Sequence, residues 1–306
     1  MSQEANRTLV VTGASGQLGR RVVELLLEKP AGQVVAVTRT PDKLKDLGQR
    51  GAIVRSGDFN DPASLDNAFA GADRLLLIST DAIGPGGGRL KQHLNAVEAA
   101  VRAGVKQVVY TSMPNPDPDS PIFFAPDHRG TEEALAKSPL SWTVHRNNWY
   151  TDTMIALGTL PRAVASGQLV AAAGDGGAAY VTREDCARAA AASLASSNTT
   201  SRTLNITGPA VVSYAQLAKI ASEITGRTVT YVPVEPEAMK AALISQGIPE
   251  LFAGLIVGSD VAKAKGKMGP ATSDYFELTG RQPTSVAAYL ATQRTALVGA
   301  GAKAAG

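Results

Sequence analysis

The 306-residue sequence lacks several features that define whole classes of protein. Its single cysteine, Cys186, excludes an internal disulfide, and no Cys/His cluster has the spacing of a metal site. No apolar run approaches the roughly 18 residues that span a bilayer, and the opening MSQEANR has no signal-peptide core. We therefore expect a soluble cytoplasmic protein with no structural metal and no membrane partner.

Charge and histidine are also sparse. Charged residues make up 19% of the chain, the formal net charge is +3, and the densest basic cluster, KAKGK at 263–267, is too short for a nucleic-acid surface. This cluster is typical of a solvated helix end. Of the three histidines, His93 is expected on an exposed helix face or at a cap, and His145 is expected to be packed inside a strand. Cys186 lies in an alanine-rich helical pattern and is expected to be a small buried residue.

What the chain does have is a regular alternation of short apolar runs and helical patterns. Continuous apolar runs rich in branched residues are typical of strands buried on both faces of a parallel sheet. They occupy 7–12, 33–38, 52–56, 74–79, 107–112 and 141–147, and helical patterns separate them at 17–29, 41–50, 62–70 and 89–103. The alternation predicts an α/β fold with a doubly wound parallel sheet over residues 1–150.

After residue 150 the pattern loosens and helices predominate. Ser213 is expected to cap a helix that ends before Gly226, much as Asp61 is expected to cap the helix at 62–70. We expect residues 151–306 to form mainly a smaller, mostly helical C-terminal lobe that binds the substrate. Segments near 178–210 are expected to return to the main sheet.

A glycine turn joins the first predicted strand to the first helix in the stretch LVVTGASGQLGRRVVELLL. Gly13, Gly16 and Gly19 suit, in turn, a tight bend, close approach of a pyrophosphate and contact between helix and strand. The helix N-terminus adds free N–H groups and the positive end of its dipole. The turn predicts a dinucleotide site, and the alternative is a structural turn without a ligand.

The end of the second strand indicates which dinucleotide binds. NAD sites usually place an acidic residue about 20 residues beyond the turn to hold the ribose 2′-hydroxyl. This chain has VTRTPDKL there, with Arg39 and then Lys43. Two cations suit a 2′-phosphate, so we expect NADP(H). The alternative is that both are solvated surface charges.

Other polar and aromatic residues follow the remaining strands, at the sheet edge where such folds bind ligands. Asp58 could accept from the adenine amino group with Phe59 against it, and Asn147 could hold the nicotinamide. The further candidates for the cofactor are Ser79, Thr80, Thr111 and Ser112, and those for a flat substrate are Asn148, Trp149 and Tyr150.

The usual proton-donating pair of such folds, a Tyr four residues before a Lys, is absent from the sequence. Tyr214 comes nearest, with Lys219 one place too far. His128, near a helix N-terminus, and Tyr150 are the remaining candidates for a catalytic proton donor. A capping or surface role for His128, and simple interface contacts for Tyr150, are the alternatives.

Several motifs together resemble the NmrA-like branch of the atypical short-chain dehydrogenases. They are TGASGQLG, VTRTPDKL, GDFNDPASLDNAFAGADRLLLIS, AGVKQVVYTS, HRNNWYTD, AAAGDGGAAYVTREDCARAAA and two C-terminal stretches, and the resemblance spans about residues 7–292. Within that branch the chain is similar to the bacterial NADPH-dependent quinone oxidoreductases and triphenylmethane-dye reductases. This implies a Rossmann domain, a small C-terminal lobe and a cleft between them.

Carried over by matching position, the resemblance implies that Ser15, Gln17 and Leu18 hold the pyrophosphate together with the glycines. It implies that Arg39 and Lys43 hold the 2′-phosphate, and that Ser79, Thr111 and Asn147 border the nicotinamide. One position departs from the pattern: some related reductases have Lys where this chain has Glu133.

The expected function is an NADPH-dependent reductase that transfers hydride to quinones or similar small conjugated acceptors, acting as a monomer or homodimer. Such acceptors need little help from side chains. Two alternatives remain: a non-enzymatic NADP(H)-binding redox sensor, and an NADPH-dependent carbonyl (ketone) reductase, for which a proton donor is mandatory.

Overall fold

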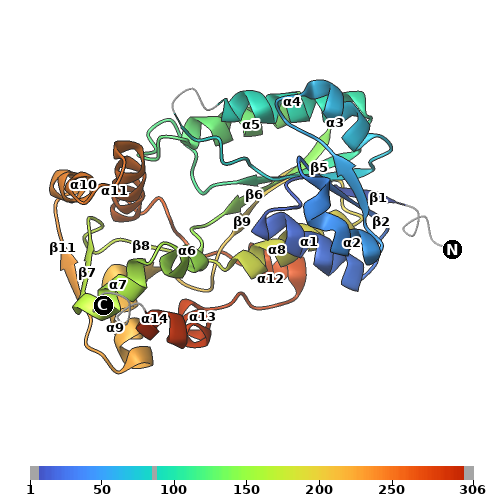
Figure 1. Cartoon of the computed structure of the whole chain (residues 1–306). Coiled ribbons are helices and arrows are strands. Elements are labelled where there is room, and N and C mark those ends of the chain that lie inside the picture. The colour runs from blue at the N-terminus through green and yellow to red at the C-terminus, as the bar shows by residue number, and fades with distance from the viewer. Residues whose placement is uncertain (1–6, 85–87, 300–306) are drawn as a thin grey trace.

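The computed structural model describes residues 7–84 and 88–299. A parallel sheet of seven strands has the order β3-β2-β1-β4-β5-β6-β9 (Figure 1). Its strands are β1 (Thr8–Val11), β2 (Gln33–Thr38), β3 (Ile53–Ser56), β4 (Arg74–Leu77), β5 (Gln107–Ser112), β6 (Ser141–Asn147) and β9 (Arg202–Ile206). The order reverses between β1 and β4, which is where folds of this type open a ligand crevice. The predicted doubly wound sheet is confirmed.

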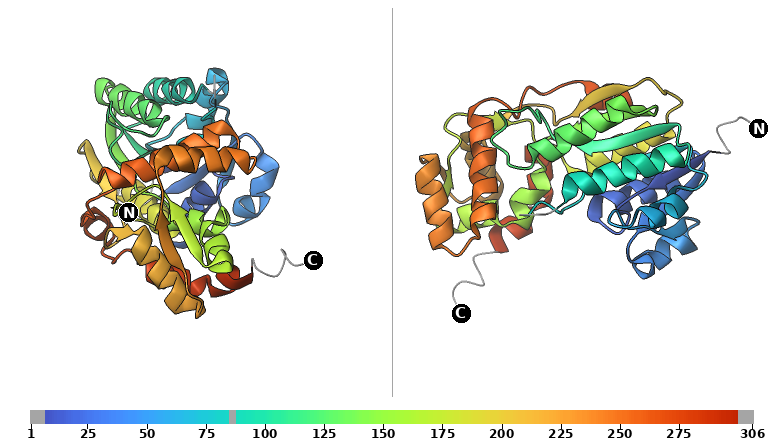
Figure 2. Two further views of the ribbon diagram at one scale, coloured as in Figure 1. Left: turned by 90° about the vertical axis from the view of Figure 1, so that its left-hand side faces the viewer. Right: turned by 90° about the horizontal axis from the view of Figure 1, so that it is seen from above.

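Helices cover both faces of the sheet, and alternate residues of each strand point to opposite faces. Val10 of β1 joins the core under α3, α4 and α5, whereas Leu9 and Val11 join the core under α1, α2 and α8. Figure 2 shows α4 and α5 running side by side across their face. The helices are α1 (Gln17–Glu28), α2 (Lys45–Gln49), α3 (Pro62–Phe69), α4 (Arg89–Arg102), α5 (Ala125–Lys137) and α8 (Arg183–Ala195). Two buried faces explain the continuous apolar runs of the strands.

Local capping follows the sequence at two helices. The Asp61 carboxylate accepts hydrogen bonds from the Ala63 and Ser64 N–H groups, with Pro62 in the first turn of α3. Ser213 forms a full capping box with Gln216 at the start of α9 (Tyr214–Thr225). The helix expected at 41–50 is instead a 3₁₀ turn, Pro41–Leu44, followed by the short α2.

Most of the remaining elements form a third apolar core beyond the carboxyl end of the sheet, whereas α12 (Asp274–Thr279) places Tyr275 in the core under α1, α2 and α8. Two small sheets lie here: β7 (Gln168–Ala171) pairs in parallel with β11 (Thr230–Pro233), and β8 (Gly177–Ala178) pairs antiparallel with β10 (Val212–Ser213). The helices are α6 (Thr151–Ala156), α7 (Thr159–Ser166), α9 (Tyr214–Thr225), α10 (Pro236–Ser245), α11 (Glu250–Ala264), α12 (Asp274–Thr279), α13 (Val286–Thr292) and α14 (Arg294–Gly299).

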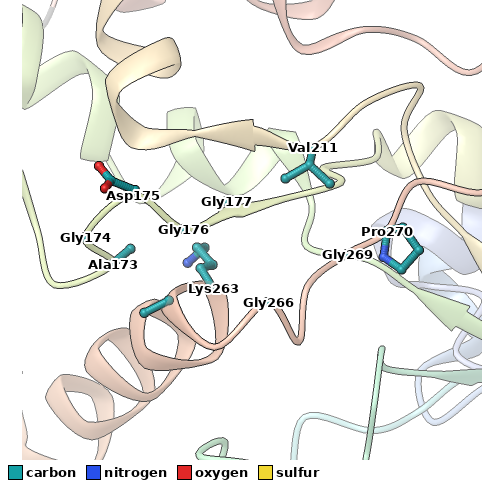
Figure 3. Close-up of a pocket in the computed structure, with 11 residues that line it drawn as sticks. Ala173, Gly174, Asp175, Gly176, Gly177, Val211, Lys263, Gly266, Gly269 and Pro270 are labelled. Atoms are coloured by element: carbon teal, nitrogen blue, oxygen red, sulfur yellow. The ribbon is translucent and has the colours of Figure 1, made fainter.

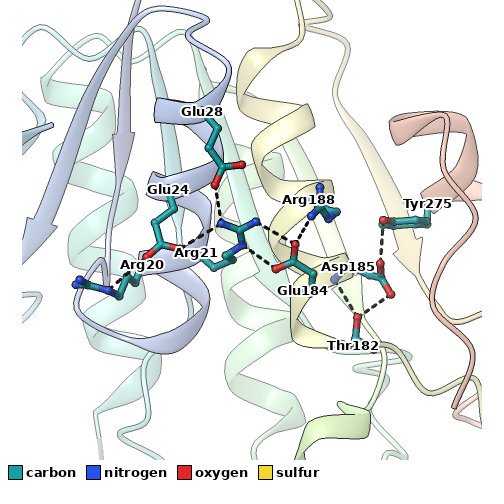
Figure 4. Close-up of polar contacts among 9 residues, drawn as sticks. All are labelled: Arg20, Arg21, Glu24, Glu28, Thr182, Glu184, Asp185, Arg188 and Tyr275. Carbon is teal, nitrogen blue, oxygen red and sulfur yellow. Dashed lines mark hydrogen bonds and ion pairs between the residues drawn. The ribbon is translucent and has the colours of Figure 1, made fainter. Parts of the chain in front are cut away.

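α8 lies between α1 and a segment from the last third of the chain (Figure 4). The Arg21 guanidinium of α1 lies 2.8 Å from the Glu184 carboxylate of α8. The neighbouring Asp185 is buried and accepts hydrogen bonds from the Tyr275 hydroxyl and the Thr284 N–H, both at 2.9 Å. β9 pairs with β6 and completes the main sheet, and α8 covers part of one face of that sheet. Both segments come from the second half of the chain. The domain boundary at residue 150 stays a prediction.

None of the helices in 7–84 and 88–299 is both long and apolar enough to cross a bilayer. In the same ranges, no three His, Cys, Asp or Glu side chains converge in a way that could hold a metal ion.

Candidate functional site

The glycine turn lies where β1 ends, beside the point at which the strand order reverses. Gly13 has a φ of +60°, a left-handed conformation that favours glycine. A Cβ atom on Gly19 would lie 2.4 Å from the Gly13 carbonyl oxygen, so only glycine lets α1 approach the turn this closely. Gly16 caps α1 without any side-chain hydrogen bond, and the first N–H groups of the helix have no partner within it. The residues therefore fit a pyrophosphate on the backbone.

Ser15, Gln17 and Leu18 complete this turn. The Ser15 hydroxyl is exposed and accepts a hydrogen bond of 2.8 Å from Thr38 at the end of β2, which ties the turn to the neighbouring strand. Gln17 is exposed and Leu18 is buried in the core under α1, so Leu18 can contribute its backbone rather than its side chain.

The corner for the 2′-phosphate adjoins the turn. Arg39 directly follows β2, and Lys43 lies in the 3₁₀ turn Pro41–Leu44; both side chains are exposed. Neither makes an ion pair with any residue of the described ranges 7–84 and 88–299. The nearby Arg20 instead pairs with Asp46. Two exposed cations without carboxylate partners are what a phosphate dianion requires.

The end of β3 offers less to an adenine than the sequence suggested. Phe59 is 9% exposed and belongs to the core under α3 and α4, so its ring serves that core. Asp58 is half-buried, and its carboxylate accepts from the Asn60 N–H at 2.9 Å. One of its acceptor oxygens remains for a ligand donor.

At the ends of β4 and β5, Ser79 and Thr111 are brought together. The Ser79 N–H donates to the Thr111 hydroxyl at 2.9 Å, and that hydroxyl lies 3.3 Å from the Ser79 hydroxyl. Ser112 points elsewhere, because it donates at 2.5 Å to Glu132, which is paired with Arg146. Thr80 donates its hydroxyl proton to Gln92 at 2.7 Å.

Asn147 and Tyr150 meet where β6 ends. The Asn147 Nδ2 group donates to the Tyr150 hydroxyl at 3.4 Å, and the Arg183 guanidinium lies 5.1 Å from the Tyr150 ring centre. The Asn147 Oδ1 atom is buried and has no hydrogen-bond partner in the described part of the chain, and such a buried acceptor is costly unless a ligand satisfies it. Burial raises the pKa of Tyr150, so the phenol keeps its proton at neutral pH. The Asn147 amide can therefore bind a carboxamide, and the protonated Tyr150 hydroxyl can donate a proton.

The next two residues are used largely within the protein. Asn148 is buried, donates to the Met268 carbonyl at 3.0 Å and accepts from the Trp149 N–H at 2.8 Å. The half-buried Trp149 ring packs against the third core, and the Lys263 ammonium lies 5.7 Å from its centre.

Lys263 corrects the expectation of a solvated cluster at 263–267. Its side chain is buried and ion-paired at 3.1 Å with the equally buried Asp260, whereas Lys265 is exposed. Its Nζ also lies 3.4 Å from the Tyr214 hydroxyl, so the fold does bring a Tyr and a Lys together. That hydroxyl donates to Asp260 at 2.7 Å, and burial raises its pKa, so the phenol stays protonated at neutral pH.

His128 and His93 are both buried beside Tyr110, on the face of the sheet covered by α4 and α5. His128 shares a 2.8 Å hydrogen bond with the Tyr110 hydroxyl, and His93 accepts from the Thr80 N–H at 3.1 Å. The expectation that His93 is exposed or caps a helix is therefore wrong, because its ring fixes the end of β4 to α4. Burial, then the charge of Arg89, lowers the pKa of both rings, which are neutral at pH 7.

The two candidate proton donors are not brought together. Tyr150 packs against the core under α1 and α8, whereas His128 bonds to a residue of the core on the opposite face. Tyr150 can therefore donate a proton to a bound acceptor without the participation of His128. His145 is buried in β6, as expected, and shares a 2.8 Å hydrogen bond with Ser193.

A hollow of about 710 Å³ lies beside the last turn of α11 (Figure 3). It is lined by residues 173–177, which lead into β8, and by Val211, Lys263, Ala264, Gly266, Gly269 and Pro270. A smaller hollow of about 230 Å³ follows β4 and is lined by Arg89 and Phe123 among others.

Comparison with known proteins identifies the family to which the chain belongs. The model of a family described as NAD(P)H-binding matches residues 13–197. Quinone oxidoreductase 2 of Escherichia coli K12 is 37% identical over 280 residues, which cover 91% of this chain and 96% of that protein. The chain belongs to the NAD(P)H-binding family.

Two solved structures share the fold of this NAD(P)H-binding protein. The NADPH complex of the E. coli quinone oxidoreductase QOR2 has a TM-score of 0.87 at 36% identity and covers 93% of this chain and 99% of its own. The NADP(H) complex of Citrobacter sp. triphenylmethane reductase has a TM-score of 0.86 at 36% identity, with 94% and 99% covered. The expected NmrA-like kinship, oxidoreductase class and nicotinamide dinucleotide cofactor are confirmed.

The sequence analysis missed two residues of this NAD(P)H-binding protein. Arg89 is 8% exposed at the start of α4, and nothing in GRLKQHLNAV distinguishes it from a surface cation. Asp260 is buried in α11, and only its spacing of three residues from Lys263 could have indicated an ion pair.

Proposed function

We propose that the protein transfers hydride from NADPH to a quinone or a similar small conjugated acceptor. The observation that carries the proposal is the pair of exposed cations, Arg39 and Lys43, beside a glycine turn that fits a pyrophosphate. The identity to quinone oxidoreductase 2 supports the acceptor class.

The cofactor supplies a hydride from the nicotinamide C4 atom. The protein's own part is to place the ring and the acceptor. The unpartnered Asn147 Oδ1 atom is suited to the carboxamide N–H group, and the linked Ser79 and Thr111 hydroxyls border the same edge. Proximity and orientation can account for about 7–11 kcal/mol of a barrier. Little further catalysis is needed when the acceptor delocalises the incoming charge.

Tyr150 is the proton donor in this proposal. Its hydroxyl accepts from Asn147 and so keeps its own proton free to donate. His128 is buried and neutral, with Nδ1 engaged by Tyr110, which leaves it the weaker candidate.

The test is NADPH oxidation with a panel of quinones, triphenylmethane dyes and simple ketones. We expect quinones and dyes to be reduced, and Tyr150→Phe to lower kcat for quinones less than about tenfold, since solvent can supply the proton. His128→Asn serves as the comparison variant. Tight NADPH binding without turnover of any acceptor would contradict the proposal, and a strict need for Tyr150 with ketones alone would favour a carbonyl reductase.

A further inference from the structure

The smaller hollow lies directly beyond the end of β4, beside the residues proposed to border the nicotinamide. Its walls are Ala82, Ile83 and Gly84, the first turn of α4, and Phe123 and Asp127. The Thr80 N–H bonds to His93 of α4, which holds the strand end against this helix. A molecule at the strand ends can therefore extend into the hollow.

Arg89 places a buried positive charge in the wall of this hollow. Only 8% of the residue is exposed, and its Nε and Nη1 atoms are buried without a hydrogen-bond partner among residues 7–84 and 88–299. The Phe124 ring covers one face of the guanidinium at 5.0 Å. No carboxylate within the described part of the chain reaches ion-pair distance of Arg89. A buried cation left unpaired costs free energy, so a site of this kind is completed by an anion.

The first turn of α4 adds to the positive potential. Its N-cap, Gly88, makes no side-chain hydrogen bond, so the helix N–H groups at this end are free of a cap. Lys91 also lines the hollow and is exposed. The opposing group is Asp127, whose pKa is raised by burial and pulled back by the charge of Arg89.

We propose that this hollow binds an anionic substituent, a carboxylate or a sulfonate, on the acceptor that the protein reduces. The inference rests on the proposed reductase function and adds a preference, among its conjugated acceptors, for those that bear an acidic substituent. A carboxylate or sulfonate oxygen can accept a hydrogen bond from the guanidinium of Arg89, and Phe123, which lines the hollow, offers an aromatic neighbour to the ring that bears the anion.

A binding experiment tests the inference without turnover. Naphthalene-2-sulfonate is titrated into NADP⁺-saturated protein by calorimetry, with naphthalene-2-methanol as the neutral analogue. We expect the sulfonate to bind at least about tenfold more tightly, and Arg89→Gln to remove that difference. Arg102→Gln, the same change at the exposed far end of α4, should leave it intact. Equal binding of both ligands to the wild type would overturn the inference.

Inorganic sulfate separates the two possible sources of the anion. Weak binding of sulfate compared with the aromatic sulfonate supports an acceptor substituent. Sulfate that binds as tightly as the sulfonate would show a site for free anions and overturn the assignment. Because this arm and the neutral analogue use the wild type, the inference stays testable even where Arg89→Gln fails to fold.

Steady-state kinetics then distinguish this inference from the proposed function. 1,4-Naphthoquinone-2-sulfonate and 1,4-naphthoquinone are compared as acceptors, and the ratio of their kcat/KM values should fall at least about tenfold in Arg89→Gln but not in Arg102→Gln. Reduction of both quinones with an unchanged ratio would refute the anion site alone. Reduction of neither, with sulfonate binding intact, would refute the reductase function alone.

Discussion

At the scale of single residues, the glycine turn proposed to bind the pyrophosphate depends on the absence of a side chain at Gly19. Gly19 has no Cβ, and the Gly13 carbonyl occupies the place where one would lie. Since backbone cannot move aside as a flexible side chain can, α1 would have to shift away from β1. Such a shift would withdraw the helix N–H groups from the pyrophosphate.

We therefore expect Gly19→Ala to weaken NADPH binding at least about tenfold and to lower the unfolding free energy by about 1–3 kcal/mol. Fluorescence titration with NADPH and urea denaturation measure the two effects. Gly51→Ala is the control for a glycine with open space around its Cβ, although its φ of +104° brings strain of its own. Unchanged NADPH affinity in Gly19→Ala would contradict the assignment of the turn.

In the proposed cofactor site, Arg39 is the residue that distinguishes NADPH from NADH. Arg39→Ala should raise the KM for NADPH about tenfold and leave the KM for NADH nearly unchanged, because only NADPH carries the 2′-phosphate. Arg50→Ala removes an equally exposed cation at the end of α2 and should change neither KM. Equal loss with both cofactors would show that Arg39 acts otherwise.

Two residue-scale expectations failed for the same physical reason. The sequence around His93 and that around Lys263 look like exposed helix, because the partners that bury them lie far away in the chain. Thr80 and Tyr110 enclose His93, and Tyr214 approaches Lys263 from α9. Periodicity reports the neighbours of a residue along its own helix and gives no sign of such distant partners.

At the scale of elements, α8 is the piece that joins the two halves of the chain. Its surface side towards α1 carries the ion pair of Glu184 with Arg21, and its buried side carries Asp185. The two carboxylates are adjacent in sequence but differ in what surrounds them. A half-exposed ion pair such as this one contributes little, whereas a buried carboxylate that accepts several hydrogen bonds leaves unsatisfied donors behind when it is removed.

Asp185→Ala should thus lower the unfolding free energy by about 3 kcal/mol, since the Tyr275 hydroxyl and the Thr284 N–H lose their acceptor. Glu184→Gln is the matched comparison and should cost about 1 kcal/mol or less. Urea denaturation followed by circular dichroism gives both values. Similar losses in the two variants would show that burial does not separate their roles.

At the scale of the whole molecule, the three histidines couple stability to pH. Burial, then the charge of Arg89, lowers the pKa of His93 to about 3, and burial, then Arg202, does the same for His145. Burial lowers the pKa of His128 as well. An unfolded histidine binds a proton near pH 6.5, so between these pKa values the unfolded chain holds more protons. Stability therefore falls as the pH falls below about 6.5.

The urea midpoint should decrease between about pH 7 and pH 5, above the range in which most carboxylates titrate. His145→Gln removes one of the three groups and should make this decrease shallower. A midpoint independent of pH in that window would contradict the burial of the histidines.

Most of the main sheet and the glycine turn could be predicted from the sequence because both are local. Each of the first six strands is a short apolar run flanked by turn residues, and the glycine turn and Arg39 lie within 27 residues of one another, from Gly13 to Arg39. The acceptor side could not be predicted in this way. Arg89, Phe123 and Asp127 meet only because α4 and α5 lie side by side.

The seventh strand has a consequence for synthesis of the chain. β9 is at Arg202–Ile206, so β6 emerges from the ribosome with one edge bare while more than fifty further residues are still to be made. Bare strand edges recruit other chains. A nascent or truncated chain that ends near residue 150 is therefore prone to aggregation, and attempts to express the nucleotide-binding half by itself should extend through β9.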